Sequence, residues 1–202
     1  MADIARFKAI RPIRDKVHLV ATRPYYSYKK NVLKAKLQDN PFTFLRIINP
    51  EFNSTVKTKV NSDGRFKLVN EQYHEFIEKN ILIQDEQPKL YLYRQSKGNT
   101  SSVGVIGGAS VQEYLNDDIK KHEATLTSRE EIFTRYLDIV GYNAEPVLIS
   151  YKGNLDINNF ISSLVDSRPE YEFSTTDLIK HELWILEDDD ADQFEKLFKQ
   201  IP

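Results

Sequence analysis

The chain has 202 residues, of which 40% are hydrophobic and 11% aromatic, enough for an ordinary core and too many for a disordered chain. Twenty-eight basic and thirty acidic residues leave a formal charge of -2. This balance excludes an overall positive field that would attract nucleic acid or an anionic membrane. Binding to either of them would require a local basic patch. The sequence has no cysteine, which excludes disulfides, thiolate metal sites and a cysteine nucleophile.

The N-terminal part of the chain is predicted to alternate between short strands and a helix. The run ARFKAIRPI has enough alternation for a first strand, and KVHLVA is typical of a second, short extended segment. A helix is expected from about Ser27 to Gln38, ending before Pro41 because the residue that precedes a proline disfavours helical geometry. The run FTFLRII, closed by Asn49 and Pro50, is rich in β-prone residues and is predicted to be a strand.

A polar stretch, NSTVKTKVNSDG, is expected to form a loop before the next helix. Apolar residues then recur at helical spacing, which predicts a helix from about Phe66 to Lys79 with Asn80 as a left-handed cap. KLYLYRQ and SVGVIGGASV are expected to be strands joined by SKGNTS, whose Gly-Asn pair favours a hairpin turn. The glycines of VGVIGGAS lack the spacing of a nucleotide-binding loop, so close packing or a bulge is favoured.

The C-terminal part is predicted to contain further helices, a short strand and a hairpin. A helix is expected to begin at Thr127 or Ser128, each followed three residues later by a glutamate, and to end at Gly141. PVLISY is predicted to be a short strand, and the next helix starts near Asp156. YEFS and LIKHELWIL are expected to pair across TTD, and a last helix spans about Asp189–Gln200.

Irregular alternation of strands and helices predicts an α+β fold, with a mixed or antiparallel sheet and helices packed on it. No repeat or linker interrupts the sequence, so residues 1–202 are expected to form a single α+β unit. The N-terminal segment carries charges throughout, and the longest uncharged apolar run, around residues 103–111, is far shorter than a membrane span. A cytoplasmic protein with neither a membrane nor a nucleic-acid partner is therefore expected.

One acidic run, Glu187 to Asp190, contains ligands that suit a hard cation. Acidic residues at the start of a helix are, however, favoured by capping and by the helix dipole. We therefore predict a helix start at this run and no metal site, and the sequence names no cofactor.

The four histidines differ in their surroundings. His18 and His74 have no partner nearby in sequence, which indicates satisfied or solvent-facing side chains. His181 alternates with apolar residues along a predicted strand, so it is interpreted as a half-buried hydrogen-bonding residue, with a ligand-binding role as the alternative.

His122 lies among Lys120, Lys121, Glu123 and Arg129. This mixture of cations and a carboxylate is able to receive an anion or to orient a histidine for acid–base chemistry. A purely structural or solvated helix end would have the same composition. The sequence alone leaves both interpretations open.

Five segments, FKAIRP, NPFTFLRIINPE, KLYLYRQ, IKKHEATL and HELWIL, resemble in order and spacing a widespread bacterial family, domain of unknown function 1015. The resemblance spans nearly the whole chain. Members of this family are longer and continue into an Asp-Gly-His-His-Arg motif that is missing here. The resemblance thus implies that the chain is the N-terminal half of a longer protein, as an expressed fragment or a natural truncation.

The missing motif is similar to phosphate-handling elements of ParB and sulfiredoxin-like proteins, an analogy at the level of the fold. It implies a site shared with the C-terminal half. His122 and Glu123 match the family's Lys-His-Glu string, and Tyr25 matches the tyrosine of its Pro-Tyr. Tyr26 stands where the family usually has an aspartate, which puts an acid–base role at that position in doubt.

Two functional hypotheses follow. In the first, the intact protein is an enzyme acting on a small phosphorylated metabolite or a nucleotide. Lys120, Lys121 and Arg129 would bind phosphate, His122 or Glu123 would transfer protons, and Tyr25 and His181 would contact the ligand. In the second, the chain is a non-catalytic binding or regulatory module whose histidine is structural.

Overall fold

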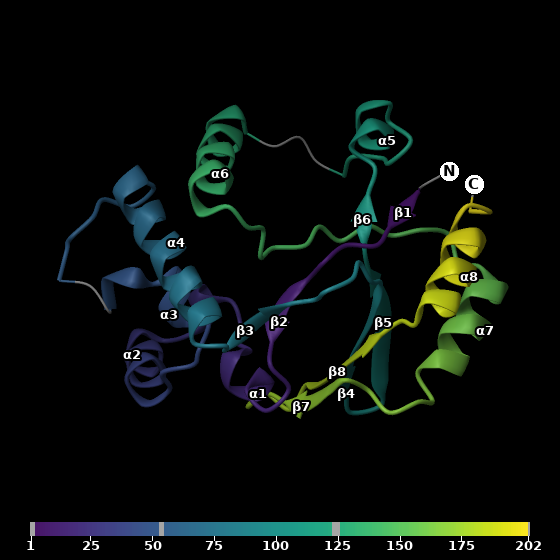
Figure 1. Ribbon diagram of the computed structural model, residues 1–202, viewed down its shortest axis with the longest axis horizontal. Coiled ribbons are helices and arrows are strands. Elements are labelled where there is room, and N and C mark those ends of the chain that lie inside the picture. The colour runs from purple at the N-terminus through teal and green to yellow at the C-terminus, as the bar shows by residue number, and fades with distance from the viewer. Residues whose placement is uncertain (1–2, 53–54, 123–125, 202) are drawn as a thin grey trace. The chain divides into compact units, whose positions relative to one another are not determined.

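The structure, a computed structural model, describes residues 3–52, 55–122 and 126–201, and its contacts divide the chain into two compact units (Figure 1). The sheet unit comprises Met1–Arg14, Gln84–Glu123 and Leu148–Pro202. The helical unit comprises Asp15–Ile83 and Ala124–Val147. Cooperative folding of residues 1–202 as a single unit stays a prediction.

A four-stranded antiparallel sheet, in the order β5-β4-β8-β7, forms the centre of the sheet unit. Its strands are β4 (Tyr91–Lys97), β5 (Thr100–Ile106), β7 (Tyr171–Ser174) and β8 (Lys180–Ile185). Hairpins join β4 to β5 and β7 to β8, as the sequence predicts. The α+β class with an antiparallel sheet is therefore confirmed.

Two helices, α7 (Leu155–Leu164) and α8 (Asp188–Phe198), lie side by side in Figure 1 and pack against the sheet face that carries Leu92 and Trp184. Both helices were expected from the apolar spacing. The core they share is formed by Leu90, Leu92, Ile157, Ile161, Trp184, Leu186, Ala191, Phe194 and Ile201. The sheet unit also contains β1 (Ile4–Ala5), which pairs with β6 (Gly108–Ala109), as well as β2 (Ile10–Pro12) and α5 (Val111–Leu115).

The helical unit is built on α4 (Asp63–Glu78) and α6 (Thr127–Val140), which pack on each other. Its shorter elements are α1 (Val17–Val20), η1 (Tyr25–Ser27), α2 (Lys30–Asp39), α3 (Leu45–Ile48) and η2 (Pro50–Phe52), and β3 (Leu82–Gln84) spans the boundary between the two units in sequence. The buried face of α4 consists of Phe66, Val69, Tyr73 and Phe76, the spacing that predicted the helix. The Ser62 side chain caps its start by accepting a hydrogen bond from the Arg65 backbone N–H.

Three predicted special positions are confirmed. Asn80 adopts φ 53° one residue after Lys79, the C-cap of α4, and Gly141 adopts φ 78° at the end of α6. Gly107 permits close packing, because a Cβ at this position would lie 2.7 Å from Ile4 Cγ1 and 2.8 Å from Leu90 Cδ2. Gly107 thus allows Ile4 and Leu90 to pack closely against the backbone.

Two segments predicted to be extended are helical instead. KVHLVA contains α1, whose Val17 and Val20 lie one helical turn apart and are both buried. FTFLRII contains α3, and its Leu45 and Ile47 have no exposed surface. A short apolar run fits a buried helix and a buried strand equally well, and here the core of the helical unit decides between them.

PVLISY, predicted to be a strand, forms no regular structure. Val147 is 83% exposed and Leu148 95% exposed, so β propensity alone does not create a strand where no neighbouring strand pairs with it. The segment SVGVIGGASV divides into β5, β6 and the start of α5. The N-cap residue of α6 is Leu126, and no side chain forms a capping hydrogen bond there. The expected capping box is therefore not formed.

The β7–β8 hairpin contains a non-glycine residue in the left-handed region. Leu178 has φ 61° and is 80% exposed at the turn. Because a Cβ in this conformation costs roughly 1–2 kcal/mol, and asparagine tolerates it better, Leu178→Asn should raise the free energy of unfolding by about 1 kcal/mol in urea titrations. Leu178→Ala keeps the Cβ and should change it little. Equal stabilities of the two variants would contradict this account.

Within the described parts of the chain, no helix has both the length and the apolar character needed to cross a bilayer.

Candidate functional site

The predicted cluster lies in the loop that follows α5, which we call the basic loop (residues 116–122). Ser110 caps α5 by accepting a hydrogen bond from the Glu113 backbone N–H. After Asp117, which adopts φ 63°, the backbone N–H groups of Asp118 and Ile119 both donate to the Glu113 carbonyl oxygen, at 2.9 and 3.2 Å. The basic loop is therefore folded back onto its own helix.

Both lysines of the basic loop make local contacts. The Lys120 ammonium donates to the Asp117 carbonyl oxygen at 2.6 Å and to its carboxylate at 3.2 Å, yet the Lys120 side chain stays 77% exposed. The Lys121 ammonium lies 4.6 Å from the centre of the Tyr114 ring, a cation–π contact. The two cations are thus positioned by short-range contacts and remain open to solvent.

His122 is exposed at the end of the basic loop. Glu123, its expected partner, lies outside the described residues. The proposed acid–base pair therefore stays a prediction. The structure does bring Lys120, Lys121 and His122 together in one exposed loop, as their adjacency in the sequence requires.

His181 sits in the sheet, in a setting different from that of the basic loop. Its ring stacks between Phe173, at 5.0 Å, and Tyr93, at 6.0 Å. Its Nδ1 lies 2.6 Å from the Tyr93 hydroxyl, and its Nε2 lies 3.3 Å from the Thr175 hydroxyl. Burial lowers the pKa of His181, against the opposing charge of Asp177. The predicted half-buried, hydrogen-bonding histidine is confirmed, and a ligand-binding role for it stays a prediction.

The other two predicted ligand-binding residues belong to the helical unit. Arg129 is exposed in the first turn of α6. Tyr25 is 55% exposed on η1, with its ring edge-to-face against Tyr26. Their assignment to the same site as His122 stays a prediction that rests on the family resemblance.

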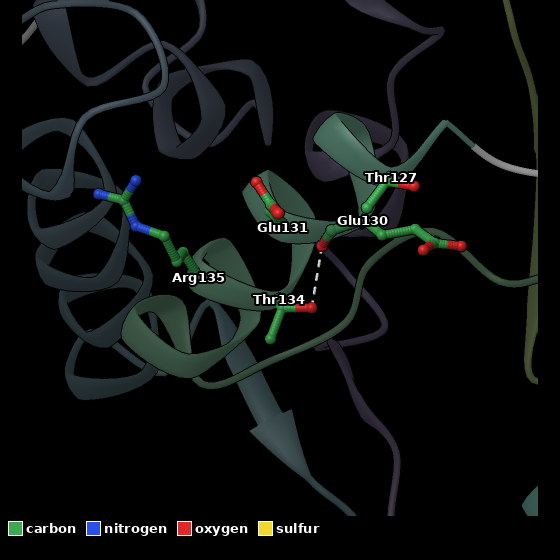
Figure 2. Close-up of a pocket in the computed structure, with 5 residues that line it drawn as sticks. All are labelled: Thr127, Glu130, Glu131, Thr134 and Arg135. Carbon is green, nitrogen blue, oxygen red and sulfur yellow. Dashed lines mark hydrogen bonds between the residues drawn. The ribbon is translucent and has the colours of Figure 1, made fainter.

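A surface hollow of about 440 Å³ lies along the start of α6, and it was not predicted from the sequence. Thr127, Glu130, Glu131, Thr134 and Arg135 line it, as Figure 2 shows. Arg135 forms an ion pair with Asp63, and the Thr134 hydroxyl donates to the Glu130 carbonyl oxygen at 2.9 Å. Two glutamates on the wall of this hollow disfavour a phosphate there.

Glu182 in β8 is 3% exposed, and internal partners strongly perturb its carboxylate. Arg94 donates to both of its oxygens, at 2.6 and 2.8 Å, and the Lys180 ammonium lies 2.9 Å away. Chiefly because of the Arg94 hydrogen bonds, the pKa of Glu182 falls to about 2. The Arg94 guanidinium also lies 4.9 Å from the centre of the Trp184 ring. These internal contacts favour a structural role for the Glu182 carboxylate.

The acidic run Glu187 to Asp190 forms the start of α8, as predicted, with three aspartates in its first turn. The Asp188 carboxylate accepts a hydrogen bond from Lys89 at 2.9 Å. Over residues 3–52, 55–122 and 126–201, no group of three or more potential metal-ligating side chains is found.

Comparison with known proteins yields a family match. The model of a family described as a protein of unknown function, DUF1015, matches residues 4–202. No curated protein and no solved structure matches the chain.

Proposed function

The chain belongs to the DUF1015 family, and from this premise and the exposed basic loop we propose that it is a binding module for a small phosphorylated ligand. The observation that carries the proposal is the placement of Lys120, Lys121 and His122 in one exposed loop. The proposal includes a cytoplasmic location, which fits a chain without cysteine.

The contacts of the basic loop support this proposal. Asp117 and Tyr114 hold the two ammonium groups near the surface, so less side-chain freedom is lost when an anion binds. A phosphate monoester carries up to two negative charges and three acceptor oxygens, which allows it to compete with the single carboxylate of Asp117 for Lys120. His122 would add a further donor.

The competing proposal is an enzyme in which His122 and Glu123 transfer protons and the C-terminal half completes the site. Groups that perform acid–base catalysis typically lie in clefts where their surroundings tune their pKa. His122 is exposed, which favours binding over catalysis for this chain. Turnover of a phosphorylated compound that is lost in His122→Ala would favour the enzyme instead.

Removal of both lysines of the basic loop should weaken phosphate binding. In a thermal-shift screen of the full chain against inorganic pyrophosphate, sugar phosphates and nucleotides, we expect compounds that raise Tm by mass action. Lys120→Ala/Lys121→Ala should raise the Kd of such a compound at least about tenfold, roughly 1.4 kcal/mol, in a salt-dependent manner. The Tm of the unliganded variant should not change, because both side chains are exposed.

His122→Ala should behave like the lysine variant, with weaker binding and unchanged stability. Lys57→Ala/Lys59→Ala provides a matched control, since both lysines are exposed in a different loop. If no phosphorylated compound stabilises the wild-type chain, or if the basic-loop variants bind as tightly as the control, the proposal is wrong.

A further inference from the structure

A second cationic surface lies in the helical unit, where residues 23–38 carry five basic side chains and no carboxylate. The local charge is therefore +5, in a chain whose net charge is -2. Two adjacent tyrosines, Tyr25 and Tyr26, lie within this stretch. We call the exposed set Tyr25, Tyr26, Lys29, Lys30 and Lys34 the tyrosine–lysine surface.

The aromatic rings of this surface face solvent. Tyr25 is 55% exposed and Tyr26 is 78% exposed, with their ring centres 5.8 Å apart in an edge-to-face pair. Tyr28 contrasts with them, because Arg23 and Lys36 lie over its ring and its hydroxyl accepts a hydrogen bond from the Arg23 backbone N–H at 3.1 Å. Tyr28 therefore makes contacts within the protein, whereas the rings of Tyr25 and Tyr26 are exposed and can contact a partner.

The three lysines of this surface are not paired with a carboxylate among the described residues. Within the described part of the chain, Lys29, Lys30 and Lys34 form no ion pair with a carboxylate. Lys30 and Lys34 are one turn apart on α2, so their side chains emerge side by side. No acidic residue lies in the first turn of α2, so its positive dipole end adds to the charge of Lys29 and Lys30. The surface therefore attracts an anion with several charges.

We propose that the tyrosine–lysine surface binds single-stranded nucleic acid. Lys29, Lys30 and Lys34 would contact successive phosphates, and Tyr25 and Tyr26 would stack on bases. Open tyrosine rings beside lysines are the combination used for unpaired strands, since only unpaired bases offer their faces for stacking. The net negative charge of the chain does not exclude nucleic-acid binding, because this local patch supplies a positive electrostatic potential.

An anionic membrane is disfavoured by the apolar residues of α2. A helix that lies in a bilayer interface needs a free apolar face. Leu37 is buried in the protein, Leu33 is half-buried, and Val32 is 39% exposed. The surface is thus rich in charge and aromatic rings and poor in aliphatic contact area. The inference is independent of the phosphorylated ligand proposed for the basic loop, which lies in the other unit.

Fluorescence anisotropy of the full chain with a labelled oligothymidylate of about 15 nucleotides tests this inference. We expect tighter binding to this strand than to a duplex of equal length. Tyr25→Ala/Tyr26→Ala should weaken single-strand binding about tenfold and leave duplex binding nearly unchanged. Its Tm should match the wild type, because both rings are exposed.

The salt dependence provides a second readout. Lys30→Ala/Lys34→Ala should make the slope of log K against log salt shallower by about 1.4, from about 0.7 for each phosphate contact in a single strand. The control Lys59→Ala/Lys67→Ala removes two exposed lysines elsewhere in the helical unit and should preserve the slope. The inference is overturned by undetectable single-strand binding at low salt, by tyrosine variants that bind like the wild type, or by preferential binding to phosphatidylserine vesicles.

Discussion

Replacing Glu182 by glutamine is expected to lower the free energy of unfolding by about 3 kcal/mol, because it leaves Arg94 and Lys180 beside a neutral group at a site that is 3% exposed. Urea titrations at neutral pH measure this loss. Glu172→Gln is the matched control: Glu172 also contacts Lys180, at 3.4 Å, but its side chain is 55% exposed, so a change below about 0.5 kcal/mol is expected.

The same carboxylate predicts a pH dependence with a defined sign. The pKa of Glu182 is about 2 in the fold, where the Arg94 hydrogen bonds lower it, against about 4.3 for an unfolded glutamate. Its contribution is therefore complete above the unfolded pKa and is lost as the pH falls from about 4.3 towards 2. The difference in stability between the wild type and Glu182→Gln should shrink over this interval. A difference that is small at pH 7 and independent of pH would contradict the structural role of Glu182.

Replacing Arg11 by methionine is expected to have a comparable effect, about 3 kcal/mol, measured as a loss of unfolding free energy. The Arg11 guanidinium bonds the Asp85 carboxylate at 2.8 Å and donates to the Tyr171 hydroxyl at 2.6 Å. The Asp85 side chain is 11% exposed and also accepts a hydrogen bond from the Tyr91 hydroxyl at 2.6 Å. Without Arg11, the Asp85 side chain loses its guanidinium partner at a site where it is only 11% exposed.

Arg14→Met provides the control for this network. Arg14 lies 3.9 Å from Glu170 and is 53% exposed, so its loss should cost less than about 0.5 kcal/mol. The double variant Arg11→Met/Asp85→Asn should cost less than the sum of the two single variants, because the second change removes the stranded charge. Additive losses would show that Arg11 and Asp85 do not stabilise each other in the fold.

The elements that the sequence predicted correctly carry their own local signals. The apolar spacing of α4 and α8 coincides with their buried faces, and Gly141 ends α6 in the left-handed conformation expected of a C-terminal glycine. The β4–β5 hairpin follows from the Gly-Asn turn, with Gly98 at φ 57°. In each of these places the information lies within a few neighbouring residues.

The wrong predictions concern segments whose conformation depends on distant residues. Ile47 is packed in a core with residues from α4 and α6, and Leu45 is also fully buried, so this β-prone run forms a short helix. PVLISY has high β propensity, yet strand formation needs a partner that offers free backbone groups. Neither the core that surrounds a segment nor the presence of a pairing strand can be predicted from the residues of that segment alone.

The candidate site could be predicted only where its residues are neighbours in sequence. Lys120, Lys121 and His122 share one loop for this reason. Within the loop, Lys120 contacts Asp117 and Lys121 contacts Tyr114. Both contacts require the chain to fold back over α5. A strand was predicted to extend to Val111, where α5 begins, so these contacts could not be predicted. The internal partners of His181 likewise come from strands that only the sheet register brings together.

The most direct test of the proposed function is a titration of the ¹⁵N-labelled full chain with inorganic pyrophosphate, followed by amide chemical shifts. Binding at the basic loop predicts saturable shifts centred on residues 117–122, with smaller changes in α5, and their loss in Lys120→Ala/Lys121→Ala. Amides of residues 117–122 that do not respond, whether or not other residues shift, would contradict the proposed function.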